Sequence, residues 1–280
     1  MNNYDTLQRF LFENLPIRGA LIHLNQTYRS ISDIHPYPAT VHQLLGQMLA
    51  ASALLSASLK YSGSLILQTQ SDGAVQPLVA QCTDQLHLRG MAHWDEKRLT
   101  RETENLLGKG HLGITIIPND GKQRYQGVVA LEDCDLATSI ESYFLQSEQL
   151  ATCICLFASE QSAHGLMLQQ MPEHLDNLNE LWEELTTFAK SLTAIELTNL
   201  SNEEILYRLF HDHDIRLFEQ TPVCFRCRCS IEKMEDALRN FGKTDALELL
   251  KTHRVIAVSC EFCNRHYEFD KVDVERIFHS

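Results

Sequence analysis

The amino-acid sequence predicts an α+β protein with a mostly antiparallel N-terminal sheet domain, a helical linker and a small C-terminal α/β module. Three observations support this class. Strand-like segments are joined by turns as far as residue 172, a helical period replaces them over 175–198, and two close cysteine pairs stand in the last part of the chain. We therefore divide the chain into an α+β core domain (1–172), an acidic helical linker (173–220) and a cysteine-bearing domain (221–280).

The core domain begins with helical and strand-like segments. Residues 5–14 carry apolar residues at helical spacing after Asp5, a typical N-cap, and predict a helix. Residues 17–24 predict a strand, and a short helix follows to about Ile34. Residues 39–60 predict a long helix, whose small residues would let neighbouring elements approach closely, so we expect it to lie centrally. These small residues are Gly46, Ala50, Ala53 and Ala57.

Short apolar runs separated by turn signals make up the rest of the core domain. They predict strands with one further helix over 135–147. Ser71-Asp72-Gly73 and Asn119-Asp120-Gly121 are hairpin turns. The predicted strands cover residues 64–70, 74–82, 86–93, 112–118, 125–131, 150–157 and 163–171.

The linker carries an apolar stripe and a strong negative charge. Over 175–198 the apolar residues recur at steps of three and four, opposite an acidic face. Ser201 and Glu204 spell a capping box that starts a second helix. Such helices should fold only while another part of the protein covers the stripe. As the surface that binds other proteins we select Leu178, Leu181, Trp182, Leu185 and Phe188.

Four cysteines in the C-terminal domain have metal-ligand spacing. Cys227 and Cys229 form a C-x-C pair, and Cys260 and Cys263 form a C-x-x-C pair after a short folded segment. Two such pairs brought together make a tetrahedral four-thiolate site, for which zinc is the preferred ion. We expect one zinc ion per chain. Around it we predict helices from Ser230 to Gly242, 245–251 and 272–278, and strands over 255–258 and 267–269.

Other cysteines and histidines offer weaker alternatives. Cys224 stands three residues before Cys227 and could pair with it, although we rank it below the 227/229 pair. His253 and His266 could each replace a sulfur ligand, but four well-spaced cysteines leave them unnecessary. The other cysteines are most simply interpreted as small core residues. They are Cys82, Cys134, Cys153 and Cys155.

Charge and hydropathy exclude several classes of function. The net charge is −13, and residues 221–280 are neutral with ten basic and ten acidic residues, which argues against a nucleic-acid partner. Residues 171–220 hold three basic and eleven acidic residues. The start lacks the basic and apolar regions of a signal peptide, and serines and a glycine interrupt the longest apolar run. With nine cysteines, we expect a reducing, cytoplasmic location and no membrane contact.

A four-thiolate site can also act as a redox sensor rather than as an enzyme. Zinc keeps its cysteines deprotonated, and the thiolate is the form that oxidants attack. Joining one pair as a disulfide removes two ligands, and with them the folding free energy that metal binding supplied. A small domain would then unfold together with any segment that leans on it. The candidate is the acidic linker, whose apolar stripe could bind unfolded chains while its charge maintains solubility.

The cysteine pattern resembles the zinc centre of the heat shock protein 33 family. The resemblance rests on Cys227-Arg-Cys229-Ser230 and on Cys260-Glu-Phe-Cys263 with Asn264-Arg-His266-Tyr267. Further strings extend it along the whole chain. They are Arg9-Phe-Leu-Phe-Glu-Asn14, Arg18-Gly19, Arg124-Tyr-Gln-Gly-Val128, Tyr143-Phe144, Ser147-Glu-Gln-Leu150 and Tyr207-Arg-Leu-Phe-His211.

The resemblance implies a cytoplasmic, ATP-independent holdase chaperone of the stress response that is inactive while reduced and zinc-bound. Oxidation would form the disulfides Cys227–Cys229 and Cys260–Cys263, release zinc, unfold the linker and produce a homodimer that binds unfolding client proteins. Two residues depart from the family pattern. Cys224 is additional, and Asn264 replaces the usual glycine, although asparagine tolerates the left-handed conformation and should form the same turn.

Two other functions remain open from the sequence. A zinc-ribbon adaptor for nucleic acid would use the same cysteines, but it would need basic surface. A thiol-disulfide oxidoreductase would use Cys260 and Cys263, but the βαβ setting of thioredoxin-like pairs is missing around them. The chaperone hypothesis accounts for the acidic linker as well as for the cysteines.

Overall fold

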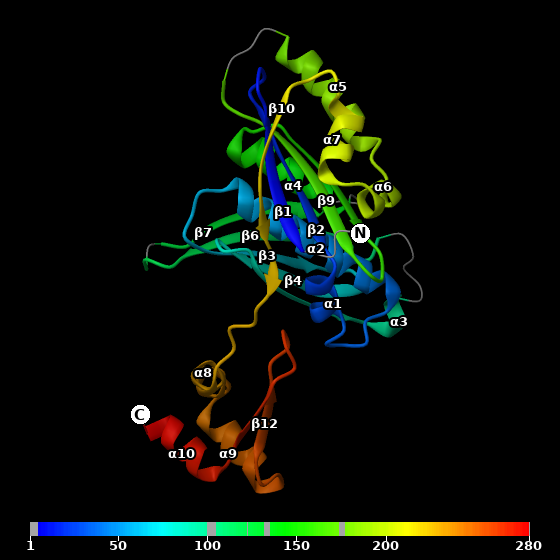
Figure 1. Ribbon diagram of the computed structural model, residues 1–280. Coiled ribbons are helices and arrows are strands. Elements are labelled where there is room, and N and C mark those ends of the chain that lie inside the picture. Colours follow the sequence, from blue (N-terminus) through cyan, green and yellow to red (C-terminus); the bar gives the residue numbers. More distant parts are fainter. Residues whose placement is uncertain (1–4, 100–104, 122, 132–134, 174–176, 280) are drawn as a thin grey trace. The chain divides into compact units, whose positions relative to one another are not determined.

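The computed structural model describes residues 5–99, 105–121, 123–131, 135–173 and 177–279. The chain forms two compact units, Met1–Phe225 and Arg226–Ser280, and each is described by itself (Figure 1). The first unit contains two sheets, and the second contains a two-stranded sheet with three helices.

The two sheets of the first unit are almost wholly antiparallel, as predicted. One sheet, here called the first sheet, has the strand order β10 (Ile215–Pro222), β1 (Thr6–Phe12), β2 (Ile17–Leu24), β9 (Ala163–Gln170) and β8 (Thr152–Ala158). The second sheet has the order β11 (Cys224–Phe225), β5 (His87–Trp94), β4 (Val75–Thr83), β3 (Gly63–Ser71), β6 (Gly110–Pro118) and β7 (Tyr125–Leu131). Only β11 and β5 pair in parallel among these strands.

Helix α2 (Ala39–Ser58) packs against both sheets, which confirms the predicted central helix. It is buried on all sides because its small residues admit the strands closely. A Cβ atom added at Gly46 would lie 2.8 Å from Cβ of Ala158 and 2.9 Å from the Tyr28 ring. The remaining helices of this core are α1 (Gln26–Ser32), α3 (Glu96–Leu99) and α4 (Leu136–Tyr143), which a π-helical turn (Phe144–Glu148) extends.

The predicted helix over 5–14 is wrong, because Thr6–Phe12 form strand β1. Leu7, Phe10 and Leu11 have a spacing that fits one face of a helix, but the strand buries its apolar residues on two opposite faces. Leu7 joins the core around α2, whereas Phe10 lies in the core on the opposite face. Asp5 does cap a helix, but a different one: its carboxylate accepts hydrogen bonds from the backbone N–H groups of Asn25 and Thr27 at the start of α1.

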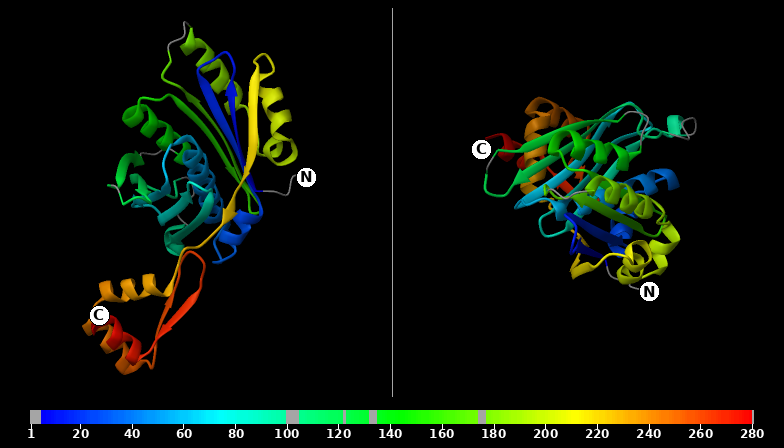
Figure 2. Two further views of the ribbon diagram at one scale, coloured as in Figure 1. Left: turned by 60° about the vertical axis from the view of Figure 1, so that its left-hand side comes forward. Right: turned by 90° about the horizontal axis from the view of Figure 1, so that it is seen from above.

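Three helices cover the other face of the first sheet, and we call them the strip: α5 (Leu178–Lys190), α6 (Ala194–Asn199) and α7 (Asn202–Phe210) (Figures 1 and 2). The sequence predicted that another part of the protein covers the apolar stripe, and that part is the first sheet. Leu185, Ala189 and Leu192 of the strip are buried among sheet residues. The sheet residues in this core are Phe10, Phe12, Ile17, Leu21, Cys153, Leu166 and Leu168.

The strip differs from the sequence prediction in two respects. The single helix expected over 175–198 ends at Lys190, and a capping box of Thr193 and Glu196 starts α6, so that Ile195 is 74% exposed. Residues 215–220, predicted as part of the helical linker, and residues 221–222, predicted as the start of the C-terminal domain, together form strand β10 and pair with β1. The capping box of Ser201 and Glu204 at α7 is confirmed.

The second unit matches the predicted elements closely. It contains α8 (Ile231–Phe241), α9 (Lys243–Thr252), β12 (Ile256–Ser259), β13 (His266–Phe269) and α10 (Lys271–His279). The Ser230 hydroxyl caps α8 by accepting a hydrogen bond from the Lys233 N–H. The fully buried apolar core is small, because it consists of Leu238, Ala246, Ile256, Phe269, Val274 and Ile277.

A chain of buried hydrogen bonds ties α7 to the first sheet. Nε2 of His23 lies 2.6 Å from Oδ1 of Asn202, and since that oxygen can only accept, His23 carries its proton on Nε2. Nδ1 of His23 is then the acceptor for Nδ1–H of His164 at 3.0 Å. The Ser162 hydroxyl donates to Nε2 of His164 at 2.8 Å, and Nδ2 of Asn202 donates to Oε1 of Gln8 at 2.6 Å. The Nδ1–Nδ1 bond in this chain therefore requires a neutral His23.

Burial holds both imidazoles in the neutral form. Desolvation, followed by the neighbouring His23, lowers the pKa of His164 to about 3, and desolvation also lowers the pKa of His23 despite its hydrogen bond to Asn202. Protonating His23 would place two N–H groups face to face across the Nδ1–Nδ1 contact, whereas protonating His164 would add its second proton at Nε2, opposite the Ser162 hydroxyl. The contribution of this network to docking of the strip is therefore complete above the ordinary histidine pKa and falls as the pH drops below it.

Acidification should loosen the strip. Because the pKa values of His23 and His164 are depressed in the docked state, docking should weaken from about pH 6.5 downward, by about 1.4 kcal/mol per pH unit for each histidine. The urea midpoint of Trp182 fluorescence, measured in a Trp94→Phe background at pH 7.5 and pH 5.5, reports this change. The double variant His23→Gln/His164→Gln should lose the pH dependence, whereas His111→Gln, at an exposed position, should retain it. Equal midpoints at the two pH values in the parent protein would contradict the role of the histidines.

Candidate metal centre

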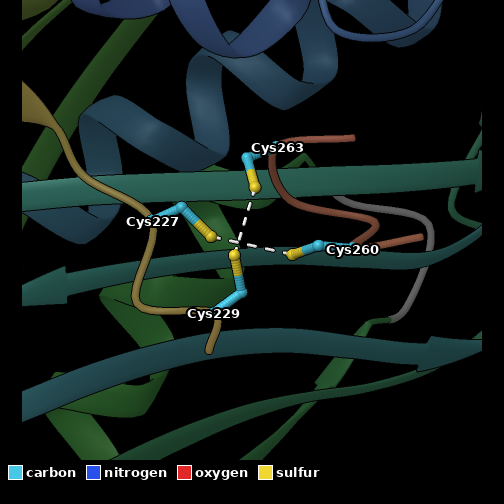
Figure 3. Close-up of side chains that lie close together, drawn as sticks. All are labelled: Cys227, Cys229, Cys260 and Cys263. Atoms are coloured by element: carbon cyan, nitrogen blue, oxygen red, sulfur yellow. Dashed lines mark hydrogen bonds between the residues drawn. The ribbon is translucent and has the colours of Figure 1, made fainter. Parts of the chain in front are cut away.

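The four predicted ligands come from two loops of the second unit. Cys227 and Cys229 lie in the extended segment that leads into α8, and Cys260 and Cys263 lie in the turn between β12 and β13. Figure 3 shows the four side chains pointing toward one another from these two segments. All four Sγ atoms lie within 4.8 Å of one another.

The arrangement of the four sulfur atoms fits a tetrahedral metal site. Sγ of Cys227 lies 3.7 Å from Sγ of Cys260, and Sγ of Cys229 lies 3.4 Å from Sγ of Cys263. A zinc–sulfur bond of about 2.3 Å in tetrahedral geometry places its sulfur ligands about 3.8 Å apart. The cluster can therefore hold one ion with little adjustment. Its donors are all thiols, a set that favours soft or borderline metals over magnesium or calcium.

Backbone hydrogen bonds shape the loop that carries Cys260 and Cys263. The Cys260 carbonyl accepts hydrogen bonds from the N–H groups of Cys263 and Asn264 at 3.2 and 2.7 Å, and the Cys260 N–H donates to the Arg265 carbonyl at 2.9 Å. Asn264 has a φ of +52°, the left-handed conformation predicted for it. The turn aims both sulfur atoms to the same side of the loop.

Tyr267 of β13 gives the site a hydrogen-bond donor that the sequence prediction missed. Its hydroxyl donates to Sγ of Cys229 at 3.1 Å. Burial alone would raise the pKa of Cys229, but the hydrogen bonds from Tyr267 and the neighbouring thiols lower it to about 7. Burial raises the pKa values of Cys260 and Cys263. The Tyr267 hydroxyl therefore favours the thiolate form of Cys229.

The alternative ligands lie outside the cluster of four. Cys224 is an exposed residue of β11 in the first unit, where it stands opposite His87 of β5 in the sheet register. Nδ1 of His266 lies 2.7 Å from the Ser259 hydroxyl, and His253 ends α9 as its C-cap. Cys134 lies outside the described residues.

The other predicted core cysteines are in the first unit. Cys82 is fully buried between α2 and the second sheet, and Cys153 and Cys155 lie on β8 facing the strip. Their interpretation as small core residues is confirmed for Cys82 and Cys153, whereas Cys155 is partly exposed.

The residues selected for client binding are mostly covered. Leu185 is fully buried, Leu178 and Trp182 are half-buried against the core beneath the strip, and Leu181 is half-buried. Only Phe188 is substantially exposed, at 40%. In this conformation the strip therefore offers little of its apolar stripe to another protein.

Among the described residues, no helix is both long and apolar enough to cross a membrane.

Comparison with known proteins gives consistent results. The family model for Hsp33 protein matches residues 5–270. The 33 kDa chaperonin of Nitrosococcus oceani is 47% identical over 278 residues, which cover 99% of this chain and 96% of the relative. The 33 kDa chaperonin of Pseudomonas syringae pv. syringae is 44% identical over 283 residues, covering 99% of this chain and 94% of the relative.

A solved structure shows the same fold at lower identity. The crystal structure of the 33 kDa chaperonin (heat shock protein 33 homolog) from Thermotoga maritima superposes with a TM-score of 0.83 at 20% identity, covering 99% of this chain and 98% of that one. The four-thiol cluster, the sequence relatives and a family match along nearly the whole chain agree, and the chain belongs to the Hsp33 family.

Proposed function

We propose that this chain is a redox-regulated, ATP-independent holdase chaperone that is inactive while its four thiols hold zinc. The observation that carries the proposal is the convergence of Cys227, Cys229, Cys260 and Cys263 in a unit with a very small core. So small a core supplies little folding free energy, and metal binding would supply much of the remainder. A reagent that removes the thiolates therefore removes much of the stability of residues 226–280.

The oxidised state follows from the chemistry of the thiols. When bound, zinc would keep all four cysteines as thiolates. Two equivalents of a two-electron oxidant would convert Cys227 with Cys229, and Cys260 with Cys263, into disulfides, and disulfide sulfur is a poor metal donor. The sulfur distances alone do not select this pairing, since all four Sγ atoms lie within 4.8 Å of one another. The close spacing of each pair along the chain supports it, because each bridge would close only a small loop.

The strip is the segment whose stability would respond to unfolding of the oxidised C-terminal domain. Its helices have 13, 6 and 9 residues, whereas isolated helices shorter than about 12–15 residues are marginal in water. The strip therefore depends on its contact with the first sheet. It is joined through β10 and β11 to Cys227, which lies two residues after β11 along the chain. We propose that residues 173–220 act as a metastable linker that opens when the oxidised C-terminal domain (221–280) unfolds.

Opening would expose two apolar surfaces for unfolded client proteins. One is the stripe of Leu178, Leu181, Trp182, Leu185 and Phe188. The other is the sheet face beneath it, which includes Phe10, Phe12 and Leu21. The surrounding negative charge would keep a complex with a client in solution. We further propose that the oxidised protein forms a homodimer and acts in the cytoplasm, without an enzymatic step.

Oxidation should release zinc and activate holding in parallel. The experiment titrates the reduced, zinc-loaded protein with hypochlorite, measures free zinc with a chromogenic chelator and follows light scattering of a heat-denaturing client in the same samples. Release of about one zinc per chain together with suppressed scattering is expected, because the four thiols form one site. Zinc that stays bound, or leaves without suppressing aggregation, would contradict the redox switch.

Removing the Tyr267 hydroxyl should weaken zinc binding. Tyr267→Phe deletes the hydrogen bond to Sγ of Cys229, and loss of such a partner of a metal ligand typically costs about tenfold or more in affinity. Chelator competition on the reduced protein measures the change. Tyr207→Phe is the matched control, because Tyr207 is 74% exposed on α7. Equal affinity in Tyr267→Phe and the parent protein would show that the hydroxyl does not support the site.

Polar substitution within the stripe should reduce client holding without changing zinc affinity. Trp182→Ser with Leu185→Ser removes the two central side chains of the stripe, so the oxidised protein should suppress aggregation less. The control is Glu183→Ser, an exposed position on the same helix. If the double variant holds clients as well as the oxidised parent does, clients bind elsewhere.

A further inference from the structure

Two cysteines outside the metal centre lie directly beneath the strip. Cys153 and Cys155 are two residues apart on β8, so that both side chains face α5. Sγ of Cys155 lies 3.5 Å from the Ala189 carbonyl of α5, and Cys153 is buried in the core that Ala189 also joins. The pair is therefore a second cluster of nucleophilic groups, and the docked strip covers it.

The two thiols differ in exposure and in acidity. Cys153 is 3% exposed, whereas Cys155 is half-buried, with its Sγ against the Ala189 carbonyl of α5. The hydrogen bond with Cys155, followed by burial, raises the pKa of Cys153, while the hydrogen bond from Cys153 lowers the pKa of Cys155. Cys155 is thus the member that becomes a thiolate, and Cys153 stands beside it with a proton.

The strand that carries the pair can change shape. β8 is an edge strand of the first sheet, with β9 as its only partner among the described strands. On its open side the Ile154 N–H donates to the Glu141 carboxylate at 2.7 Å. Alternate residues on a strand have Cα atoms roughly 6.6 Å apart, close to the upper limit of about 6.8 Å for a disulfide. A bridge from Cys153 to Cys155 would therefore draw them together and bend β8 at Ile154.

We propose that Cys153 and Cys155 are a second oxidation site, which the docked strip protects and which oxidants reach once the strip has opened. The Cys155 thiolate attacks a peroxide oxygen, forming a sulfenic acid and releasing hydroxide. Cys153 then attacks the sulfenyl sulfur, forming the disulfide and expelling the oxygen as water. Two thiols and one peroxide give one disulfide and two waters.

The disulfide would hinder return of the strip to the sheet. Leu185 and Ala189 pack in the core that contains Cys153, with Cys155 at its edge. A bend at Ile154 displaces both sulfur atoms from that contact. Oxidation of the pair would therefore prolong the open state after the metal-binding thiols have been reduced. The inference rests on the proposed function only for the event that opens the strip.

The decisive experiment opens the strip by amino-acid substitution instead of by oxidation of the metal centre. Leu185→Ser introduces a hydroxyl at a fully buried position of α5, and Phe188→Ser, at the 40% exposed position, is the matched control. Asn202→Ala, which breaks the hydrogen-bond chain at α7, is a second opening variant in case Leu185→Ser does not fold. The reduced, zinc-loaded proteins are exposed to hydrogen peroxide, quenched with iodoacetamide and digested with chymotrypsin.

The chymotryptic peptide of residues 151–156 contains both cysteines and no others, so its mass reports the pair alone. Disulfide formation removes two hydrogens from this peptide. We expect it to be at least about tenfold faster in the opening variants than in the parent protein and Phe188→Ser, because the protection of a covered group follows the equilibrium between docked and open strip. Thiols that persist in the opening variants would overturn the proposed site, and equal rates in all proteins would overturn its protection by the strip. Both results are independent of whether zinc release activates holding.

A second measurement tests the consequence for recovery. The parent protein and Cys153→Ala/Cys155→Ala are oxidised fully and then returned to thiol reductant and zinc, and Trp182 fluorescence follows re-docking in a Trp94→Phe background. We expect re-docking several-fold faster in the alanine variant. Equal rates of re-docking would overturn the proposal that the disulfide prolongs the open state.

Discussion

The burial of the first sheet on both faces is the constraint on which the rest of the structure depends. One face packs against α2 with Leu7 and Ile22, and the other packs against the strip with Phe10 and Leu21. A sheet with two apolar faces cannot expose either of them to water without a large loss of hydrophobic free energy. The strip is thus a part of the core that depends on its contact with the sheet, because its own helices are too short to be stable alone.

Buried polar groups make that cover specific. The hydrogen-bond chain through His23, His164 and Asn202 places α7 at one position on the sheet, and it is complete only when His23 is neutral. Cys155 contributes a weaker hydrogen bond to the Ala189 carbonyl of α5. Removing a partner from such a network leaves buried donors or acceptors unsatisfied, which costs more than the bond itself contributes. The strip therefore has one well-defined docked position on the sheet.

The second unit differs from the first because its apolar core is small. Two loops place four thiols within bonding distance of one ion, and a backbone turn at Asn264 aims two of them. Tyr267 adds a hydrogen bond that favours the thiolate at Cys229. The same groups that can bind a metal tightly are the groups that oxidants attack. Stability and reactivity in this unit consequently reside in the same four side chains.

The sequence by itself determined the features that depend on local spacing. Residues close together in the chain determine these features, because a few bonds fix their geometry. They are the cysteine pairs, the caps at Ser201 and Ser230, the central helix and most strands. The left-handed turn at Asn264 is of the same kind.

The tertiary structure alone decided features that depend on distant partners. Residues 6–12 fit a helical spacing equally well, and only pairing with β2 and β10 between two cores makes them a strand. Residues 215–222 form β10 because β1 offers a free edge, not because of any strong period of their own. Likewise, nothing local shows that Asn202 meets His23, or that Cys155 lies under Ala189, since these contacts join segments far apart in the sequence.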